Sequence, residues 1–364
     1  MVKGAMNTVL GAGMAVLVSG CMNMGPKRMQ EDRRLYAGAA AESWKYQALQ
    51  NIVKLRYTDW PSFIEISQIA TSYTFEQTGS AKATLRQPFR GDNDQLEAGW
   101  VGKMSERPTV LYKPLTGEKF VNSMLTPIPP AAVLGLIQSG WAADQMFAML
   151  VSSVNGINNV DLRYGEMSRA ETGYADLLRL LSELQKQKAL VVEIRQEKLD
   201  EKNVKSYAII GFRKAMLDDE TREELAAVQK VLGLDPLLDR YRVVWDVAIK
   251  DPDKLSIQTR SILQVMVALS MYIDVPQSDI DEGRVVMMKP VPKTDDTGLP
   301  ELISIKSGEK QPPDAYVAIE YRDRWFWIED TDVWSKRTFA YLSLLLTVSE
   351  SDSKSGAQLV ITTN

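Results

Sequence analysis

The sequence of 364 residues contains no histidine, and this absence excludes more chemistry than any other feature of its composition. Without imidazole the chain cannot form a Ser-His-Asp or Cys-His catalytic pair. It also cannot form a histidine-ligated zinc, iron or copper site. Proton transfer near neutral pH would require a carboxylate or a lysine with a shifted pKa. We therefore predict no catalytic residue, no metal ligand and no cofactor.

Cysteine is almost as scarce, because Cys21 is the only one in the chain. A single cysteine allows no internal disulfide. If Cys21 serves as an anchor, as argued below, the folded part also lacks a thiolate nucleophile. A protein with a sizeable core does not depend on disulfides for stability.

Positive charge is neither abundant nor clustered, since the formal net charge is −4 and no basic run occurs. The sequence therefore lacks the electrostatic features of nucleic-acid binding and of adhesion to anionic lipid. Hydrophobic residues make up 45% and charged residues 25%, which is typical of a globular chain. The length suits one large domain or two of ordinary size.

The N-terminus carries the most specific signal. Lys3 precedes an apolar or small stretch of 14 residues, 5–18. A membrane-spanning helix needs about 20 such residues, so this length is typical of a signal peptide instead. The stretch ends in Val18-Ser19-Gly20-Cys21, which resembles the lipobox of bacterial lipoproteins. In that pattern an aliphatic residue and two small residues precede the cysteine that receives the lipid.

This resemblance implies cleavage between Gly20 and Cys21 and attachment of acyl chains such as palmitate to Cys21. Residues 1–20 would be the signal peptide and residues 21–30 a lipidated tether. Met22 follows the cysteine, which in enterobacterial lipoproteins favours the outer membrane. We expect a lipid-anchored protein on the periplasmic face of the outer membrane, with membrane lipid as one partner. Two alternatives stay open: a conventional secretory signal with a free cysteine, and an uncleaved signal anchor.

Hydrophobic periodicity and Pro/Gly positions predict an α+β fold with mixed helices and mainly antiparallel strands. We expect one large or two associated domains, with a helical/β region at 31–165 and an α+β region at 166–364. Helices are expected near 28–57, 130–139, 142–154, 170–187, 218–232, 261–272 and 332–349. Strands are expected near 63–76, 189–195, 206–214, 241–249, 302–306, 315–322, 325–329 and 358–362.

An aromatic hairpin at 315–329 is the most distinctive local pattern. A turn at Asp323-Arg324 would pair Tyr321 with Phe326. One face would then carry Val317, Ile319, Tyr321, Phe326 and Ile328, and the other Tyr316, Glu320, Trp325, Trp327 and Glu329. Two tryptophans two residues apart can form a platform for sugar rings or for a protein partner. We favour the alternative, in which the apolar C-terminal helix covers them.

Acidic residues cluster in Glu329-Asp330-Thr331-Asp332. Paired carboxylates can serve glycoside hydrolysis or hold a divalent cation. The cluster also lies where a strand becomes a helix, so we favour Asp332 or Thr331 as a helix N-cap. A second acidic run, Asp92-Asn93-Asp94, matches a calcium loop only weakly because Leu96 stands where the next ligand belongs.

Two serine-containing segments have structural interpretations. Ser335-Lys336 lacks the spacing of a Ser-Lys catalytic dyad, because adjacent helical residues diverge by about 100°. The segment 152–159, Ser-Ser-Val-Asn-Gly-Ile-Asn-Asn, would line a site or, as we favour, form a helix C-terminus with Asn155 or Gly156 in the left-handed conformation. The common hydrolase and nucleotide-binding motifs are absent beyond the signal peptide.

Two longer segments carry a further resemblance. Asn51-Ile52-Val53-Lys54-Leu55-Arg56-Tyr57 and the following Phe63-Ile64-Glu65-Ile66-Ser67 form the first. Tyr321-Arg322-Asp323-Arg324-Trp325-Phe326-Trp327-Ile328-Glu329 through Phe339 forms the second. Together with the lipobox they resemble a family of uncharacterised bacterial envelope lipoproteins. The resemblance implies no catalytic residue.

These features favour a lipid-anchored docking or structural component of an envelope assembly, with an unidentified envelope protein as partner. The candidate interaction surface is Trp325, Trp327, Tyr316 and Glu329. The first alternative is a module that binds or cleaves cell-wall polysaccharide through Trp325, Trp327 and the nearby carboxylates. The second is a carrier of small apolar ligands, which requires a large closed apolar pocket.

Overall fold

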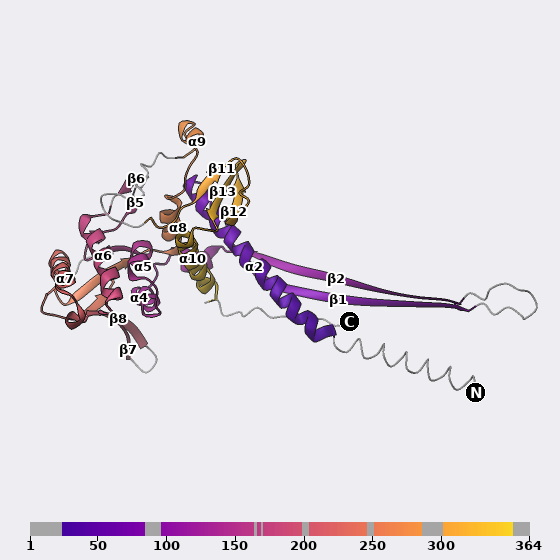
Figure 1. The fold of residues 1–364 in the computed structure, drawn as a ribbon, viewed down its shortest axis with the longest axis horizontal. Helices are drawn as coiled ribbons and strands as arrows, with labels where there is room; N and C mark the ends of the chain where they lie inside the picture. The colour runs from indigo at the N-terminus through magenta and orange to yellow at the C-terminus, as the bar shows by residue number, and fades with distance from the viewer. Residues whose placement is uncertain are drawn as a thin grey trace, which may run out of the picture. The chain divides into compact units, whose positions relative to one another are not determined.

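The computed structural model describes residues 24–83, 96–163, 166–168, 170–198, 204–245, 251–285 and 301–351 (Figure 1). These residues form helices and mostly antiparallel sheets, which confirms the predicted α+β fold. They divide into two compact units. The larger unit combines residues up to 61 with residues 116–350, and the smaller unit consists of residues 62–115.

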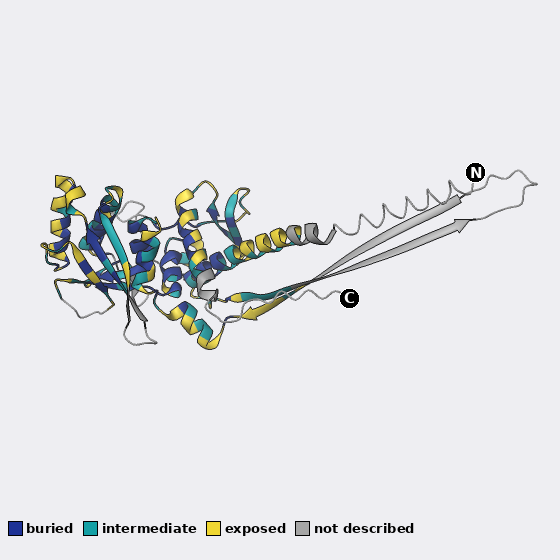
Figure 2. Cartoon of the chain, turned by 90° about the horizontal axis from the view of Figure 1, so that it is seen from below, coloured by how far each residue is buried: buried dark blue, intermediate teal, exposed yellow. Residues whose placement is uncertain are grey.

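A long helix, α2 (Met24–Arg56), begins the described part of the larger unit, close to the predicted range. Its burial is uneven, as Figure 2 shows. The last two turns are buried, whereas Leu35 and Tyr46 are 52% and 49% exposed. Burial on α2 is therefore concentrated in its C-terminal turns. Only the C-terminal turns of α2 lie among the other elements of this unit, where they contact α8 (Ile262–Ser270) and β12 (Ala315–Tyr321).

The end of α2 is a Schellman motif, a helix stop in which a residue with positive φ closes the last turn. Thr58 has a φ of 58°. The Thr58 N–H donates to the Leu55 carbonyl at 3.2 Å, and the Asp59 N–H donates to the Lys54 carbonyl at 2.8 Å. Pro61 follows and prevents the helix from continuing.

A six-stranded sheet forms the centre of the larger unit, in the order β4-β3-β10-β9-β8-β7. Its strands are β3 (Val151–Val154), β4 (Ile157–Asn158), β7 (Leu190–Lys198), β8 (Val204–Phe212), β9 (Arg240–Val244) and β10 (Lys254–Thr259). Strands β9 and β10 pair in parallel, and the other neighbours pair antiparallel. Strands from both sides of residue 165 thus share one sheet.

Helices pack against this sheet and against one another. They include α4 (Pro130–Gln138), α5 (Ala143–Leu150), α6 (Thr172–Lys186) and α7 (Asp219–Val231). On α6, a stripe of four leucines with helical spacing is buried: Leu177, Leu180, Leu181 and Leu184. The helix expected over 142–154 ends at Leu150, because the following four residues form β3 and pair with β10.

A three-stranded sheet, β11-β13-β12, and the C-terminal helix complete the larger unit. Its outer strand β11 is Lys306–Gly308, the central strand β13 is Arg324–Glu329, and the helix is α10 (Val333–Ser351). The remaining elements are α3 (Gly117–Phe120), η1 (Val121–Leu125), β5 (Asp161–Arg163), β6 (Glu166–Ser168), η2 (Lys214–Met216) and α9 (Gln277–Asp281).

The smaller unit is a single antiparallel hairpin of two long strands, β1 (Ile64–Ala83) and β2 (Leu96–Pro114). We call it the ribbon. At about 3.3 Å per residue, a strand of 20 residues extends for about 65 Å. The strand predicted at 63–76 is part of β1. The pairing with β2 joins residues 64 and 114 at one end and residues 83 and 96 at the other.

Candidate functional site

The aromatic hairpin forms as predicted, with one change of register. The turn lies at Arg322-Asp323, which have φ values of 51° and 62°, and Tyr321 pairs with Arg324 rather than with Phe326. A two-residue hairpin turn needs positive φ at both central positions, so the turn itself decides the pairing. The expected partners are wrong by two residues. A shift of two keeps every side chain on its face, so Val317, Ile319, Phe326 and Ile328 are buried together.

The opposite face of this hairpin carries the tryptophans of the candidate interaction surface. Trp325 and Trp327 are both half-buried, so neither an open platform nor a fully covered core describes them. The Trp327 ring lies directly against Gly308 of β11, where an added Cβ would approach the ring to 3.1 Å. The neighbouring strand β11 therefore occupies part of this face.

Tyr316, another residue of that surface, packs against α10 and beneath two lysines. Its ring meets the ring of Phe339 edge-on, with centroids 6.2 Å apart. The ammonium groups of Lys45 and Lys336 lie 4.6 and 5.2 Å from the centroid of the same ring. These cation–π contacts tie α2 and α10 to the start of β12.

The carboxylates after β13 are engaged in stabilising the fold. Glu329 forms a 2.6 Å ion pair with Lys306, and Asp330 forms a 2.6 Å ion pair with Lys336. Asp332 caps α10: its Oδ1 accepts from the Ser335 N–H at 3.0 Å. The N-cap interpretation is confirmed for Asp332. Within the described residues no group of three or more acidic, histidine or cysteine side chains is arranged to hold a metal ion.

Ser335 is buried, and its hydroxyl makes hydrogen bonds that hold parts of the fold together. Its hydroxyl donates to Oδ2 of Asp332 at 2.6 Å and accepts from the Ser304 N–H at 2.8 Å. The side chain is thereby held between the first turn of α10 and the segment that precedes β11. The neighbouring Lys336 instead reaches Asp330.

The turn at Asn155-Gly156 joins β3 to β4 and does not end a helix. Both residues have positive φ, 46° and 84°, as predicted, but they lie in a strand-to-strand turn. The Asn155 amide donates to the Leu232 carbonyl at 2.7 Å and accepts from the Ser256 N–H at 2.7 Å. The asparagine therefore links β10 to the end of α7, and the helix C-terminus expected here is wrong.

The C-terminal end of α5 is closed by buried polar side chains from three other segments. Arg260 donates to the carbonyls of Ala148 and Met149, each at 3.0 Å, and to that of Val160. Asn159 also donates to the Ala148 carbonyl, at 2.9 Å. A cation at a helix C-terminus is stabilised by the helix dipole and satisfies carbonyls that lack a partner in the helix.

A buried tyrosine closes the same helix end. The Tyr174 hydroxyl donates to the carbonyls of Phe147 and Val151, at 2.9 and 3.2 Å. Burial raises the pKa of this phenol, with Arg260 lowering it less strongly. The phenol stays neutral and serves as a donor to the backbone.

The two segments that carry the family resemblance meet at Tyr57. Its ring contacts Tyr321 and Phe326 edge-on, with centroid separations of 5.5 and 6.0 Å. Asp59 accepts hydrogen bonds from the Tyr321 hydroxyl and from Arg322, the latter at 2.9 Å. These contacts join the end of α2 to the tip of the aromatic hairpin, so both segments have a shared structural role.

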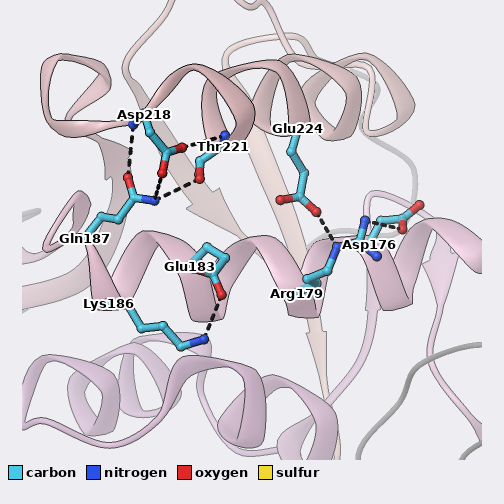
Figure 3. A network of polar contacts seen from close by, with 8 residues as sticks. All are labelled: Asp176, Arg179, Glu183, Lys186, Gln187, Asp218, Thr221 and Glu224. Carbon is cyan, nitrogen blue, oxygen red and sulfur yellow. Dashed lines mark hydrogen bonds and ion pairs between the residues drawn. The ribbon is translucent and has the colours of Figure 1, made fainter.

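An acidic cleft lies between α6 and α7 and encloses about 680 Å³. Its acidic lining residues are Asp176, Glu183, Asp218, Glu220, Glu223 and Glu224. Arg179 extends from α6 and reaches Glu224 at 2.5 Å and Asp176 at 3.0 Å (Figure 3). The hydrogen bond to Glu224 is the main reason that the Arg179 pKa is raised.

Further contacts along this cleft join the same two helices. Gln187 donates to Asp218 and Thr221, at 3.0 and 2.9 Å (Figure 3). Asp218 in turn caps α7 by accepting from Thr221, which lowers the Asp218 pKa. The polar groups drawn together here stabilise the helix pair.

The apolar cavity beneath α6 bears on the ligand-carrier alternative. It is lined by residues such as Phe147, Leu181 and Ile210 and has a volume of only about 20 Å³. That is close to the space of a single water molecule, whereas a ligand pocket has about 300 Å³ or more. This cavity cannot hold a small apolar ligand.

The ribbon exposes apolar side chains at the end nearest residues 62 and 115. Ile64, Leu111 and Tyr112 are 43%, 56% and 60% exposed. Only Phe63 and Leu115 are buried among the described side chains of this unit. A hairpin has no interior, so these apolar groups remain on its surface.

The ribbon as a pair of strands was not predicted from the sequence, because only its first strand was expected. Its signal lies in two segments read together rather than in either alone. In the register of the two strands Glu65 is opposite Lys113, a residue of opposite charge. Searching the chain for two segments with complementary charge in antiparallel register would have revealed this pattern.

Several predicted features lie outside the described residues. They are the signal peptide, the cleavage site at Gly20 and Cys21, the acidic run Asp92-Asn93-Asp94 and the strand expected at 358–362. Of the helices that the structure describes, none combines the length and the apolar character needed to cross a membrane.

Comparison with known protein families, curated proteins and solved structures finds no match for this chain.

Proposed function

We propose that this protein is a lipid-anchored component of the cell envelope that docks onto a larger assembly through its ribbon. The proposal combines the lipobox-like segment ending at Cys21 with one structural observation. Ile64, Leu111 and Tyr112 lie exposed on a two-stranded hairpin that has no core of its own. Exposed apolar groups clustered on one element are typical of protein interaction surfaces.

The ribbon is a better docking element than the tryptophan face. Trp325 and Trp327 are half-buried, and part of their face is occupied by Gly308. Glu329, on the same face, is held by Lys306. In the ribbon, in contrast, Tyr112 is 60% exposed, and no other described strand pairs with β1 or β2.

The polysaccharide alternative receives less support from the geometry. A module that cleaves glycosidic bonds needs two carboxylates facing the substrate, one of them protonated. Glu329 and Asp330 are each ion-paired with a lysine of the same unit, so both carboxylates are already engaged within the fold. Both indoles would also have to be open to a sugar ring, and both are half-buried.

Attachment of lipid can be tested by mass spectrometry of the native N-terminal peptide. We expect a peptide that begins at Cys21 and carries the mass of acyl chains. A peptide that retains residues 1–20, or a Cys21 thiol without lipid mass, would contradict the anchoring half of the proposal.

Docking can be tested by native purification from detergent-solubilised envelopes. The double variant Leu111→Ser and Tyr112→Ser should lose the partners that the wild-type protein retains, because it removes apolar area from the ribbon. Leu237→Ser is a matched control, since Leu237 is 86% exposed in the larger unit. Equal loss of partners in both variants, or in neither, would contradict docking through the ribbon.

A further inference from the structure

The amino-terminal half of α2 is a largely solvated helix. None of the side chains from 31 to 43 is buried, and most of them are exposed (Figure 2). The half-buried ones, Asp32, Tyr36 and Ala40, are spaced four apart and therefore form a single row along the helix. The first buried side chain of the described helix is Ala48, and the turns around it pack against α8 and β12. Residues 24–43 of α2 thus project from the larger unit.

The composition of this projecting segment explains how it remains helical with so little packing. Four of the five residues from 37 to 41 are alanine, the best helix former. Glu42 and Lys45, three residues apart, form a 2.6 Å ion pair that supports the last turn of the segment. The packed C-terminal turns of α2 provide a helical nucleus, and extending a helix from a nucleus is far more favourable than starting one. The segment can therefore continue the helix into solvent.

The charges of the projecting segment are distributed around the whole helix. The residues 31–34, Glu-Asp-Arg-Arg, are consecutive, so their side chains point in directions about 100° apart. A helix that lies in a membrane interface has one apolar face and one basic face. The only large apolar side chains from 31 to 43 are Leu35 and Tyr36, which are adjacent and form no stripe. The segment is therefore suited to water rather than to a membrane surface.

We infer that residues 24–43 are a rigid spacer that holds the larger unit away from the bilayer to which Cys21 is anchored. This inference rests on the lipid anchor of the proposed function and adds a distance to it. α2 begins at Met24, three residues after Cys21. At about 1.5 Å per residue the spacer extends for about 30 Å. The larger unit thereby meets its partners clear of the lipid headgroups.

Gly38 is the weakest position of the spacer, because glycine favours a helix less than any residue except proline. A Cβ added at Gly38 would meet no atom within 4 Å. Gly38→Ala should therefore strengthen the helix without a clash. Gly38→Pro should break or kink it, because proline removes a backbone donor and its ring clashes with the preceding turn. The two substitutions change the stiffness of the helix in opposite directions at one solvated position.

Spin labels can measure this stiffness in the complete chain with Cys21→Ser. Labels at Glu31→Cys and Leu237→Cys mark the spacer and the larger unit, and both positions are exposed. We expect a narrow distribution of distances between the labels for the otherwise unsubstituted chain and for Gly38→Ala. For Gly38→Pro the distribution should be shifted or broader. The same distribution in Gly38→Pro and in the unsubstituted chain would overturn the rigid spacer.

The distance from the membrane can be tested with the lipidated protein on vesicles of phosphatidylethanolamine and phosphatidylglycerol. A donor dye is attached to Leu237→Cys, which is the only free thiol once Cys21 is acylated, and an acceptor dye to the lipid headgroups. Seven residues of alanine, glutamate and lysine inserted after Ala39 lengthen the helix by two turns, about 10 Å. Seven residues of glycine and serine at the same place are the matched control, because they add the same length of flexible chain.

We expect the helical insertion to lower the efficiency of energy transfer and the flexible insertion not to lower it, because a flexible segment lets the larger unit approach the bilayer. A helical insertion without effect, or equal effects of the two insertions, would overturn the spacer and leave the lipid anchor intact. A chain that does not bind the vesicles would contradict the lipid anchor, and this inference with it.

Discussion

The Tyr57 hydroxyl donates a 2.6 Å hydrogen bond to Oδ2 of Asp279, a residue 222 positions further along the chain. Asp279 belongs to the short helix α9 and is 5% exposed, so its carboxylate depends on donors within the protein. The Tyr57 ring also contacts Tyr321 and Phe326. One side chain thus joins the end of α2 to α9 and to the aromatic hairpin.

Removing this hydroxyl should destabilise the larger unit. Tyr57→Phe keeps the ring contacts but leaves the buried Asp279 carboxylate without its phenol donor, which costs about 1–3 kcal/mol. Urea unfolding followed by circular dichroism measures the difference. Tyr46→Phe on the same helix is the control, because Tyr46 is 49% exposed and should change the free energy of unfolding little. Equal effects of the two substitutions would contradict the role assigned to the hydroxyl.

Buried phenols should make the fold sensitive to alkali. Burial raises the pKa of Tyr57, Tyr174 and Tyr241 above that of a free tyrosine. Above pH of about 10 the unfolded chain loses these protons while the folded chain keeps them, so stability falls as pH rises. Each such group contributes a slope of about 1.4 kcal/mol per pH unit. In unfolding curves between pH 8 and about 11.5, Tyr174→Phe should show a shallower decline than wild type. If the wild type and Tyr174→Phe lose stability with the same slope, the buried phenol of Tyr174 is not a source of the alkaline sensitivity.

Removing the backbone strain at Thr58, just after the end of α2, should stabilise the protein. Thr58 has a φ of 58°, a conformation that is costly for a β-branched residue. Thr58→Gly removes this cost, and the gain should be about 1 kcal/mol after the greater freedom of glycine in the unfolded chain is counted. A higher melting temperature is expected. Thr58→Ala should fall between glycine and threonine, and a melting temperature below wild type for glycine would contradict the argument.

Loss of the cap on α10 should cost about 1 kcal/mol. Asp332→Ala removes the acceptor of the Ser335 N–H and of the Ser335 hydroxyl. Asp332→Asn keeps an oxygen at the same position and should retain most of the stability. Asp314→Ala, at an exposed position, is the neutral control. Chemical denaturation ranks the variants, and an Asp332→Ala protein as stable as wild type would count against the cap.

Replacing Arg260 with lysine should destabilise the protein. Arg260 is 4% exposed, and its guanidinium group contacts three carbonyls at once, those of Ala148, Met149 and Val160. A lysine has one compact ammonium group and cannot reach all three, so at least one buried carbonyl loses its donor, at a cost of about 1–3 kcal/mol. Arg240→Lys, at an exposed ion pair with Glu193, is the control and should cost much less. Similar unfolding midpoints for the two variants would contradict this prediction.

Much of the larger unit could be predicted because its signals are local. The leucine stripe of α6, the strands that became β7 and β8 and the Asp332 cap each depend on residues within a few positions of one another. For the aromatic hairpin, the prediction assigned side chains to the correct faces but paired the wrong residues. Alternation along a strand determines the face of each side chain, whereas the turn residues determine the register. The helix predicted over 142–154 ends at Leu150. Residues 151–154 form β3 instead, because their pairing with β10 outweighs the local apolar pattern.

The sequence by itself determined the amino-terminal signal pattern, the exclusion of histidine chemistry and the period of most helices and strands, because these follow from composition and near-neighbour spacing. Only the tertiary structure decided which half of α2 is buried, that β3 joins β10, that Tyr57 reaches Asp279, and that β1 and β2 pair with each other as a two-stranded ribbon. Such relationships join residues far apart in the chain. Their free energy depends on complementary shape and on loop closure, neither of which is encoded in a local pattern of polar and apolar residues.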